Sequence, residues 1–128
     1  MSAVTHADAV ALFERRRDAW VAGDLDAYLA LFAPDLVIDI PRRDRIVGRD
    51  AYAELVRVSH EHVVPVRFEF HHLAVHGTTV LSEWTIEIEF RADGRRATYD
   101  GMSRCELRDG LIVSWREYYD PAQLTRTD

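Results

Sequence analysis

Four consecutive segments in the second half of the chain alternate between apolar and charged side chains. These segments are residues 66–75, 80–90, 97–107 and 111–119. In the second segment, for example, Trp84, Ile86 and Ile88 alternate with Thr85 and Glu87. Successive side chains of a strand point to opposite faces, so each segment is predicted to be a strand with one apolar and one charged face. Short turns join the segments, which predicts an antiparallel sheet with one covered face and one wetter face.

The sequence before this sheet predicts helices. Residues 5–22 carry apolar side chains at helical spacing, with Thr5 in position to cap the helix and Gly23 to end it. Asp24 starts a second, short helix that Pro34 is expected to stop.

A short strand and a third helix complete the first half. The strand is predicted at residues 36–40 and the helix from residue 50 to about residue 60. Helices followed by an antiparallel meander are typical of the α+β class. The length of 128 residues suits one domain, so residues 1–128 are interpreted as a single domain.

Charge, hydropathy and cysteine content limit the classes of partner and the cellular location that we expect. The net charge is −6, from 16 basic and 22 acidic residues, which argues against a nucleic-acid partner. No apolar stretch approaches the ~20 residues of a membrane span, and the start of the chain lacks a secretory pattern. Cys105 is the one cysteine, so no intrachain disulfide forms, and a cytoplasmic location is the prediction.

The predicted covered face also carries scattered polar groups. They are His72, Ser82, Tyr99, Ser103 and Glu117. Several polar groups on an apolar concave face are typical of a ligand pocket. A well-satisfied core has the same composition less often.

Three motifs in chain order carry a family resemblance. They are "AGDLDAYLALFAPDLVIDIP" at 22–41, "VGRDAYAELV" at 47–56 and "LRDGLIVSWREYYDP" at 107–121. The chain resembles the SnoaL-like branch of the nuclear-transport-factor-2-like superfamily. The resemblance implies a cystatin-like α+β roll, in which a cone-shaped, curved antiparallel sheet surrounds a hydrophobic pocket that N-terminal helices close. Relatives include polyketide cyclases, ketosteroid isomerases, limonene epoxide hydrolases and binding modules without chemistry, so the fold alone leaves the function open.

The closing motif is most similar to that of the epoxide hydrolases, whose catalytic aspartate position matches Glu117. Their arginine and second aspartate fall on Trp84 and Ile86 here, so that mechanism is not expected.

The ketosteroid isomerase pattern is also incomplete. Its oxyanion-hole acid falls on Ser103, its tyrosine on or near Arg16, and its basic aspartate on Ile40 in an ungapped match. Asp39 lies one residue away, and because a shift of one residue changes the face, its orientation stays open.

Glu117 is the first candidate catalytic residue. A carboxylate on an apolar face loses hydration, which raises its pKa and suits a general acid or base. The alternative is a glutamate at the core edge, paired with an arginine. Arg16 lies within the apolar stripe of the first helix and is expected to bind a substrate carbonyl or carboxylate, or to pair with Glu117 or Asp39. The alternative for Arg16, and for its neighbour Arg17, is a packed stem with a solvated head group.

His72 is a further candidate base or donor on the predicted covered face, or else a core histidine bound to the backbone. The sequence His60-Glu61-His62 has the wrong spacing for one helix face, so neither a metal nor any other cofactor is expected.

Five side chains are predicted to line the substrate pocket, unless they are plain core residues: Trp20, Trp84, Tyr99, Ser103 and Trp115. Together with the catalytic candidates they predict a cofactor-independent acid–base enzyme acting on a small hydrophobic cyclic, polyketide-like or terpenoid molecule. The alternative is a non-catalytic ligand-binding or dimerisation module of the same fold.

The charged face of the sheet predicts a homodimer. Glu83, Glu87 and Glu89 are expected near Arg104, Arg108 and Arg116, with Met102 and Tyr118 as apolar anchors. A patch that carries both charges can meet its own copy across a twofold axis. Relatives usually pair through this face.

Overall fold

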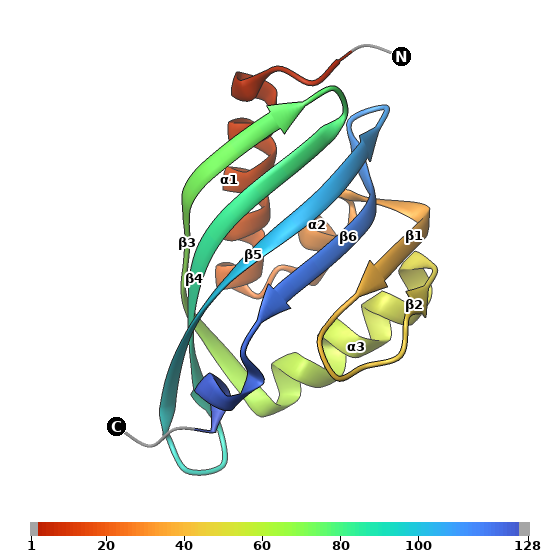
Figure 1. Ribbon diagram of the computed structural model, residues 1–128. Coiled ribbons are helices and arrows are strands. Elements are labelled where there is room, and N and C mark those ends of the chain that lie inside the picture. The colour runs from red at the N-terminus through yellow and green to blue at the C-terminus, as the bar shows by residue number, and fades with distance from the viewer. Residues whose placement is uncertain (1–2, 126–128) are drawn as a thin grey trace.

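The computed structural model describes residues 3–125 (Figure 1). Its elements in chain order are α1 (His6–Ala22), α2 (Leu25–Leu29), β1 (Phe32–Asp39), β2 (Ile46–Val47), α3 (Arg49–His62), β3 (Val63–His76), β4 (Thr79–Phe90), β5 (Arg96–Arg108), β6 (Leu111–Tyr119) and a short 3-10 helix, η1 (Pro121–Leu124).

The six strands form one curved, open sheet in the order β2–β1–β6–β5–β4–β3. β1 runs parallel to β6, and every other neighbouring pair is antiparallel. The helices gather on one side of the sheet, where α1 packs on β3 and α3 packs on β1 and β3 (Figure 1). This confirms the predicted α+β fold with N-terminal helices on a curved sheet. We call the side toward the helices the covered face and the opposite side the outer face.

The first helix has the predicted ends. The Thr5 hydroxyl accepts a hydrogen bond from the Asp8 backbone N–H, and the Asp8 carboxylate accepts one from the Thr5 backbone N–H. At the other end, Gly23 has a φ of 70°, in the left-handed region where a side chain is unfavourable. These local signals fix both ends of α1, the helix that carries Arg16.

Pro34 does not end the second helix, so that prediction is wrong. α2 ends at Leu29, and Pro34 lies inside β1, which starts at Phe32 rather than at residue 36. The register against β6 shifts between Phe32 and Val37. A proline lacks the N–H that a regular ladder needs, and an irregular stretch tolerates it.

A β-bulge in β3 reverses the face of His72. Phe70 lies opposite Trp84, but His72 lies opposite Glu83, so His71 is the additional residue. Beyond the bulge, Leu73 packs against the core and His72 points to the outer face. The predicted covered-face position of His72 is therefore wrong, because one additional residue exchanges the two faces of a strand.

A second irregularity lies at the start of β6. The register against β5 shifts between Glu106 and Leu107, and Ile112 rather than Leu111 is completely buried. From Trp115 onward the predicted alternation holds, since Trp115 is buried and Arg116 is exposed.

The core consists of two packed clusters on the covered face. The larger one includes Phe13, Tyr28 and Trp115, and the smaller one includes Phe68 and Trp84. Trp20 and Phe70 pack against both clusters and connect them. Within residues 3–125, every helix is too short or too polar to cross a membrane.

Candidate functional site

Glu117 lies on the covered face of β6, beside Ser103 of β5. Its carboxylate accepts a hydrogen bond from the Trp115 indole, with 3.0 Å between Nε1 and Oε1. Both side chains point the same way because they are two residues apart on a regular stretch of strand. The predicted orientation of Glu117 is confirmed, and its role in proton transfer stays a prediction.

The surroundings of Glu117 favour its neutral form. Burial raises the pKa of this carboxyl above the ordinary glutamate value, and the Arg16 charge and the Trp115 hydrogen bond oppose this shift. Burial is the larger effect because an apolar environment penalises the charged carboxylate. A carboxyl group with a raised pKa can hold or accept a proton closer to neutral pH.

Arg16 is buried inside the fold, with 3% of its surface exposed. Its Nη2 donates to the Tyr28 hydroxyl over 3.1 Å, and its Cζ lies 4.0 Å from the centroid of the Trp115 ring. In the part of the chain that the structure describes, Nε and Nη1 of Arg16 have no hydrogen-bond partner. Arg17 lies at the surface and pairs with Asp18, so Arg16 is the arginine of α1 that enters the core.

Arg16 and Glu117 do not form the close pair that was one of the expectations. No nitrogen–oxygen contact within 4.0 Å joins them among the ion pairs of residues 3–125. The two groups interact through space, and the Trp115 side chain contacts both. The site therefore holds a buried cation and a carboxylate that are near each other but unpaired.

Two tyrosines complete this polar cluster, and the sequence pattern did not identify them. The hydroxyls of Tyr28 and Tyr52 lie 2.7 Å apart, and both side chains are buried. Burial raises the pKa of both phenols, so both stay protonated. The aromatic character of Tyr28 was visible as part of an apolar helix face, but its polar role depends on α2 meeting both α1 and α3 in space.

Asp39 belongs to the outer face. Ile38 is buried and lies opposite Trp115, so the next side chain, Asp39, points away from the covered face. Arg45 donates to its two carboxylate oxygens over 2.9 and 3.1 Å and lowers the pKa of this carboxyl. The structure does not bring Asp39 and Glu117 together as a catalytic pair.

His72 is also separated from Glu117. Its side chain is 83% exposed on the outer face and lies 3.9 Å from Glu83. The bulge at His71 places it there, so the geometry gives no support to His72 as a catalytic residue.

The five predicted pocket residues lie in or against the core on the covered face, where Trp84 contacts both Ser103 and Tyr99. Trp84 Nε1 donates to the Ser103 hydroxyl over 3.3 Å, and its ring lies 5.7 Å from that of Tyr99. Trp20 packs edge-on against Phe68, with 5.4 Å between the ring centroids. Their contact with a substrate stays a prediction.

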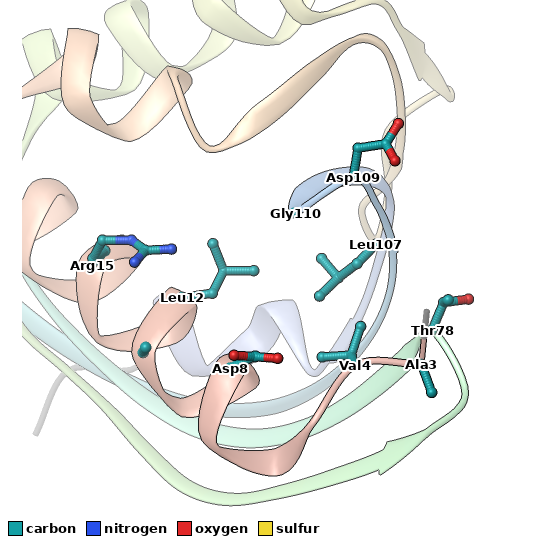
Figure 2. Close-up of a pocket in the computed structure, with 10 residues that line it drawn as sticks. Ala3, Val4, Asp8, Leu12, Arg15, Thr78, Leu107, Asp109 and Gly110 are labelled. Atoms are coloured by element: carbon teal, nitrogen blue, oxygen red, sulfur yellow. The ribbon is translucent and has the colours of Figure 1, made fainter. Parts of the chain in front are cut away.

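A groove of about 410 Å³ reaches Glu117 from the surface. It lies between the end of β6 and the loop after β1, and its lining is Asp39, Ile40, Pro41, Arg42, Arg43, Arg116, Glu117, Tyr118 and Tyr119. A second groove, of about 400 Å³, separates Leu12 and Arg15 of α1 from Asp109 in the β5–β6 turn (Figure 2). The first groove is the candidate entrance because Glu117 itself belongs to its lining, whereas none of the predicted site residues lines the second.

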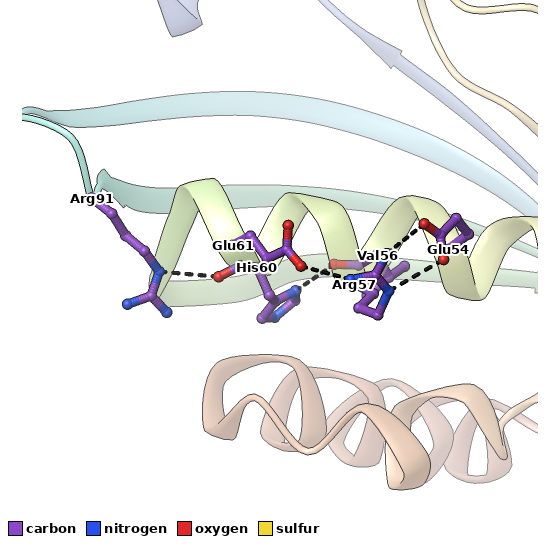
Figure 3. Close-up of polar contacts among 6 residues, drawn as sticks. All are labelled: Glu54, Val56, Arg57, His60, Glu61 and Arg91. Carbon is purple, nitrogen blue, oxygen red and sulfur yellow. Dashed lines mark hydrogen bonds and ion pairs between the residues drawn. The ribbon is translucent and has the colours of Figure 1, made fainter.

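His60 and Glu61 of α3 have partners within their own helix. The His60 ring bonds to the Val56 carbonyl, and Glu61 pairs with Arg57 over 2.6 Å, as Figure 3 shows. Over residues 3–125, no group of three His, Cys, Asp or Glu side chains is arranged to hold a metal ion. The absence of a cofactor stays a prediction.

The comparisons with known proteins agree with this fold. Residues 13–115 match the SnoaL-like domain family. The chain belongs to the SnoaL-like family. No curated protein matches the chain.

Several solved structures share the fold of this SnoaL-like protein. An LEH-like epoxide hydrolase from M. tuberculosis is 26% identical, with a TM-score of 0.80 over 93% of this chain and 87% of the other. A provisionally assigned polyketide cyclase from Xanthomonas campestris is 24% identical, with a TM-score of 0.78 over 92% and 94%. A provisionally assigned isomerase from Bacillus subtilis is 19% identical, with a TM-score of 0.83 over 93% and 91%. The relatives thus include cyclases, isomerases and epoxide hydrolases, and the activity of this member is a separate question.

Proposed function

We propose that this SnoaL-like protein is a cofactor-independent acid–base enzyme. Its substrate would be a small hydrophobic cyclic, polyketide-like or terpenoid molecule, and the reaction an isomerisation, cyclisation, dehydration or addition of water. One observation carries the proposal: Glu117, a carboxyl group with a raised pKa, lies on the covered face of the sheet and lines a groove. Perturbed carboxylates in clefts mark catalytic sites more often than chance.

The neighbouring side chains have roles that follow from their contacts. Glu117 moves the proton, and the Trp115 indole holds the carboxylate in one orientation. The buried Arg16 guanidinium stabilises negative charge on a substrate oxygen, because its unused N–H groups act in a dry environment.

The rival proposal is a non-catalytic ligand-binding or dimerisation module. It is favoured by the close packing of the predicted pocket residues, since Trp84 and Ser103 are fully buried and bonded to each other. In that case Glu117 and Arg16 are structural groups of the core.

The substitution Glu117→Gln separates the two proposals. Glutamine keeps an oxygen acceptor for Trp115 but neither holds nor releases the proton. The assay uses a panel of hydrophobic cyclic ketones in heavy water, some neutral and some carrying a carboxylate group. The wild type should exchange the hydrogens next to the carbonyl of at least one of them, followed by NMR. The variant should lose roughly 100-fold or more in that rate, the usual contribution of a general acid–base group.

Glu14→Gln is the matched control, because Glu14 is an exposed glutamate of α1 outside the site and the outer face. It should exchange at the wild-type rate. Equal exchange in Glu117→Gln and the wild type would refute the catalytic proposal, as would a wild type that catalyses no exchange or other turnover with the panel.

We also propose that the outer face forms a homodimer. Leu81, Met102 and Tyr118 are exposed there, at 46%, 51% and 55%. The charges pair differently from the prediction, since Arg108 binds Asp35 and Glu87 contacts Arg67 and Arg96 within the chain.

Two arginines of the outer face remain available for a second copy. Arg104 and Arg116 lie directly opposite each other on β5 and β6, without an ion pair among the described residues. Like charges in register are unfavourable unless carboxylates such as Glu83 of a second copy approach them.

A further inference from the structure

We propose that the substrate of this site is an organic acid whose carboxylate binds to Arg16. The inference rests on the proposed function, because the bound acid is a substrate only if the protein is an enzyme. The binding of a carboxylate to Arg16 can be tested without any turnover.

The first argument is the set of unused donors on a buried cation. A guanidinium has five N–H groups. Arg16 gives one hydrogen bond to Tyr28, and its Nε and Nη1 have no partner within residues 3–125. Buried polar groups without partners are costly, and a charged one more so. A ligand that supplies hydrogen-bond acceptors to these N–H groups would remove this cost.

The second argument is the way in which aromatic rings surround the guanidinium. Its Cζ lies 4.0 Å from the ring centroid of Trp115, 5.1 Å from that of Phe68 and 5.5 Å from that of Tyr28. Rings stabilise the cation but accept no conventional hydrogen bond from the unused N–H groups. A carboxylate matches this planar donor set because its two oxygens accept parallel N–H bonds.

The tyrosine pair extends the donor set. The Tyr28 hydroxyl accepts from Arg16 and lies 2.7 Å from the Tyr52 hydroxyl. One hydroxyl donates to the other, so the second proton of the pair is free for an oxygen of a ligand.

The third argument is the charge at the entrance. Arg42, Arg43 and Arg116 line the groove that reaches Glu117, and none has an ion-pair partner among the described residues. The acid at this rim, Asp39, is already paired with Arg45. A positive entrance on a chain of net charge −6 attracts anions and increases their association rate.

Glu117 and Trp115 connect this entrance to Arg16. The groove reaches Glu117, whose carboxylate binds the indole on which Arg16 stacks. The aromatic rings beyond Glu117 must move aside for a ligand to reach the guanidinium. Binding should therefore change the fluorescence of Trp115.

A pair of probes of equal shape tests the proposal. We would titrate the full chain with 2-naphthoate and with the uncharged 2-naphthamide, using calorimetry and tryptophan fluorescence at low salt. The wild type should bind naphthoate at least tenfold more tightly, the factor expected for charge-assisted hydrogen bonds. Arg16→Met should lose this preference, since an apolar side chain of similar length replaces the donors.

Arg17→Met is the matched control on the same helix and should keep the preference, because Arg17 is exposed and paired with Asp18. Arg16→Lys provides a second variant should Arg16→Met fail to fold, and it should bind naphthoate more weakly than the wild type. Glu117→Gln should bind naphthoate at least as tightly as the wild type, whether or not that variant still catalyses exchange.

Three results would overturn the proposal. One is equal affinity of the wild type for the acid and the amide. Another is an undiminished preference in Arg16→Met or, where that variant is unfolded, in Arg16→Lys. The third is loss of the preference in Arg42→Gln or Arg43→Gln with Arg16 intact, which would locate the anion at the entrance.

Discussion

Substitution of Gly101 by alanine is predicted to destabilise the sheet through the Trp84 ring. Gly101 lies on β5 opposite Trp84, and a Cβ atom at this position would come within 2.5 Å of Trp84 Cη2 and 2.6 Å of Cζ2. The backbone oxygen of Tyr118 would lie 2.8 Å from this new Cβ atom. The indole must therefore move, although it is 1% exposed and packed in the core.

The expected loss follows from these contacts. Overpacking of a core costs about 1–3 kcal/mol, and displacing the indole from its hydrogen bond with Ser103 adds about 1 kcal/mol. The free energy of unfolding should fall by roughly 2–4 kcal/mol. With an unfolding entropy of about 2.1 cal/mol/K per residue over 128 residues, the melting temperature should fall by roughly 7–15 °C.

Calorimetry of Gly101→Ala, Trp84→Phe and the double variant tests whether the clash with the Trp84 ring causes the loss of stability. Phenylalanine lacks the two ring atoms that the new methyl group would meet, so the double variant should lose less stability than the two single losses together. A melting temperature of Gly101→Ala within about 1 °C of the wild type would refute the reasoning, as would strict additivity.

Two further predictions concern pH and assembly. Because burial raises the pKa of Glu117, the folded state binds its proton more tightly than the unfolded chain does. This contribution to stability is present at acidic pH and is lost as the pH rises through the raised pKa, so the stability of the wild type relative to Glu117→Gln should fall in that interval. The measurement is denaturation of both proteins as a function of pH. If the stability of the wild type relative to Glu117→Gln instead rises with pH, the Arg16 charge outweighs burial in its effect on the pKa of Glu117. Light scattering at micromolar concentration should give twice the 14.8 kDa mass of the chain, and Met102→Glu should give a monomer; a wild-type mass near one chain would contradict the dimer.

Local patterns in the sequence predicted much of this fold. The capping residue Thr5 and the terminating Gly23 determine α1, because helix ends depend on neighbouring backbone groups. The alternation in the late segments predicted β4, β5 and the second half of β6, and with them the orientation of Trp115 and Glu117. A period of two is a property of the strand itself, and no distant contact is needed to read it.

The site itself depends on contacts between distant segments. The bulge at His71 moves His72 to the outer face, and the residue types in that stretch do not predict a bulge. Arg16 meets Tyr28 and Trp115 only because α1, α2 and β6 converge, and its pairing could not be inferred from helical spacing. The sequence alone therefore determined which faces are apolar and that Glu117 lies on one of them. Only the tertiary structure decided that Arg16 is buried with unused donors, because burial depends on what the rest of the chain places around a side chain.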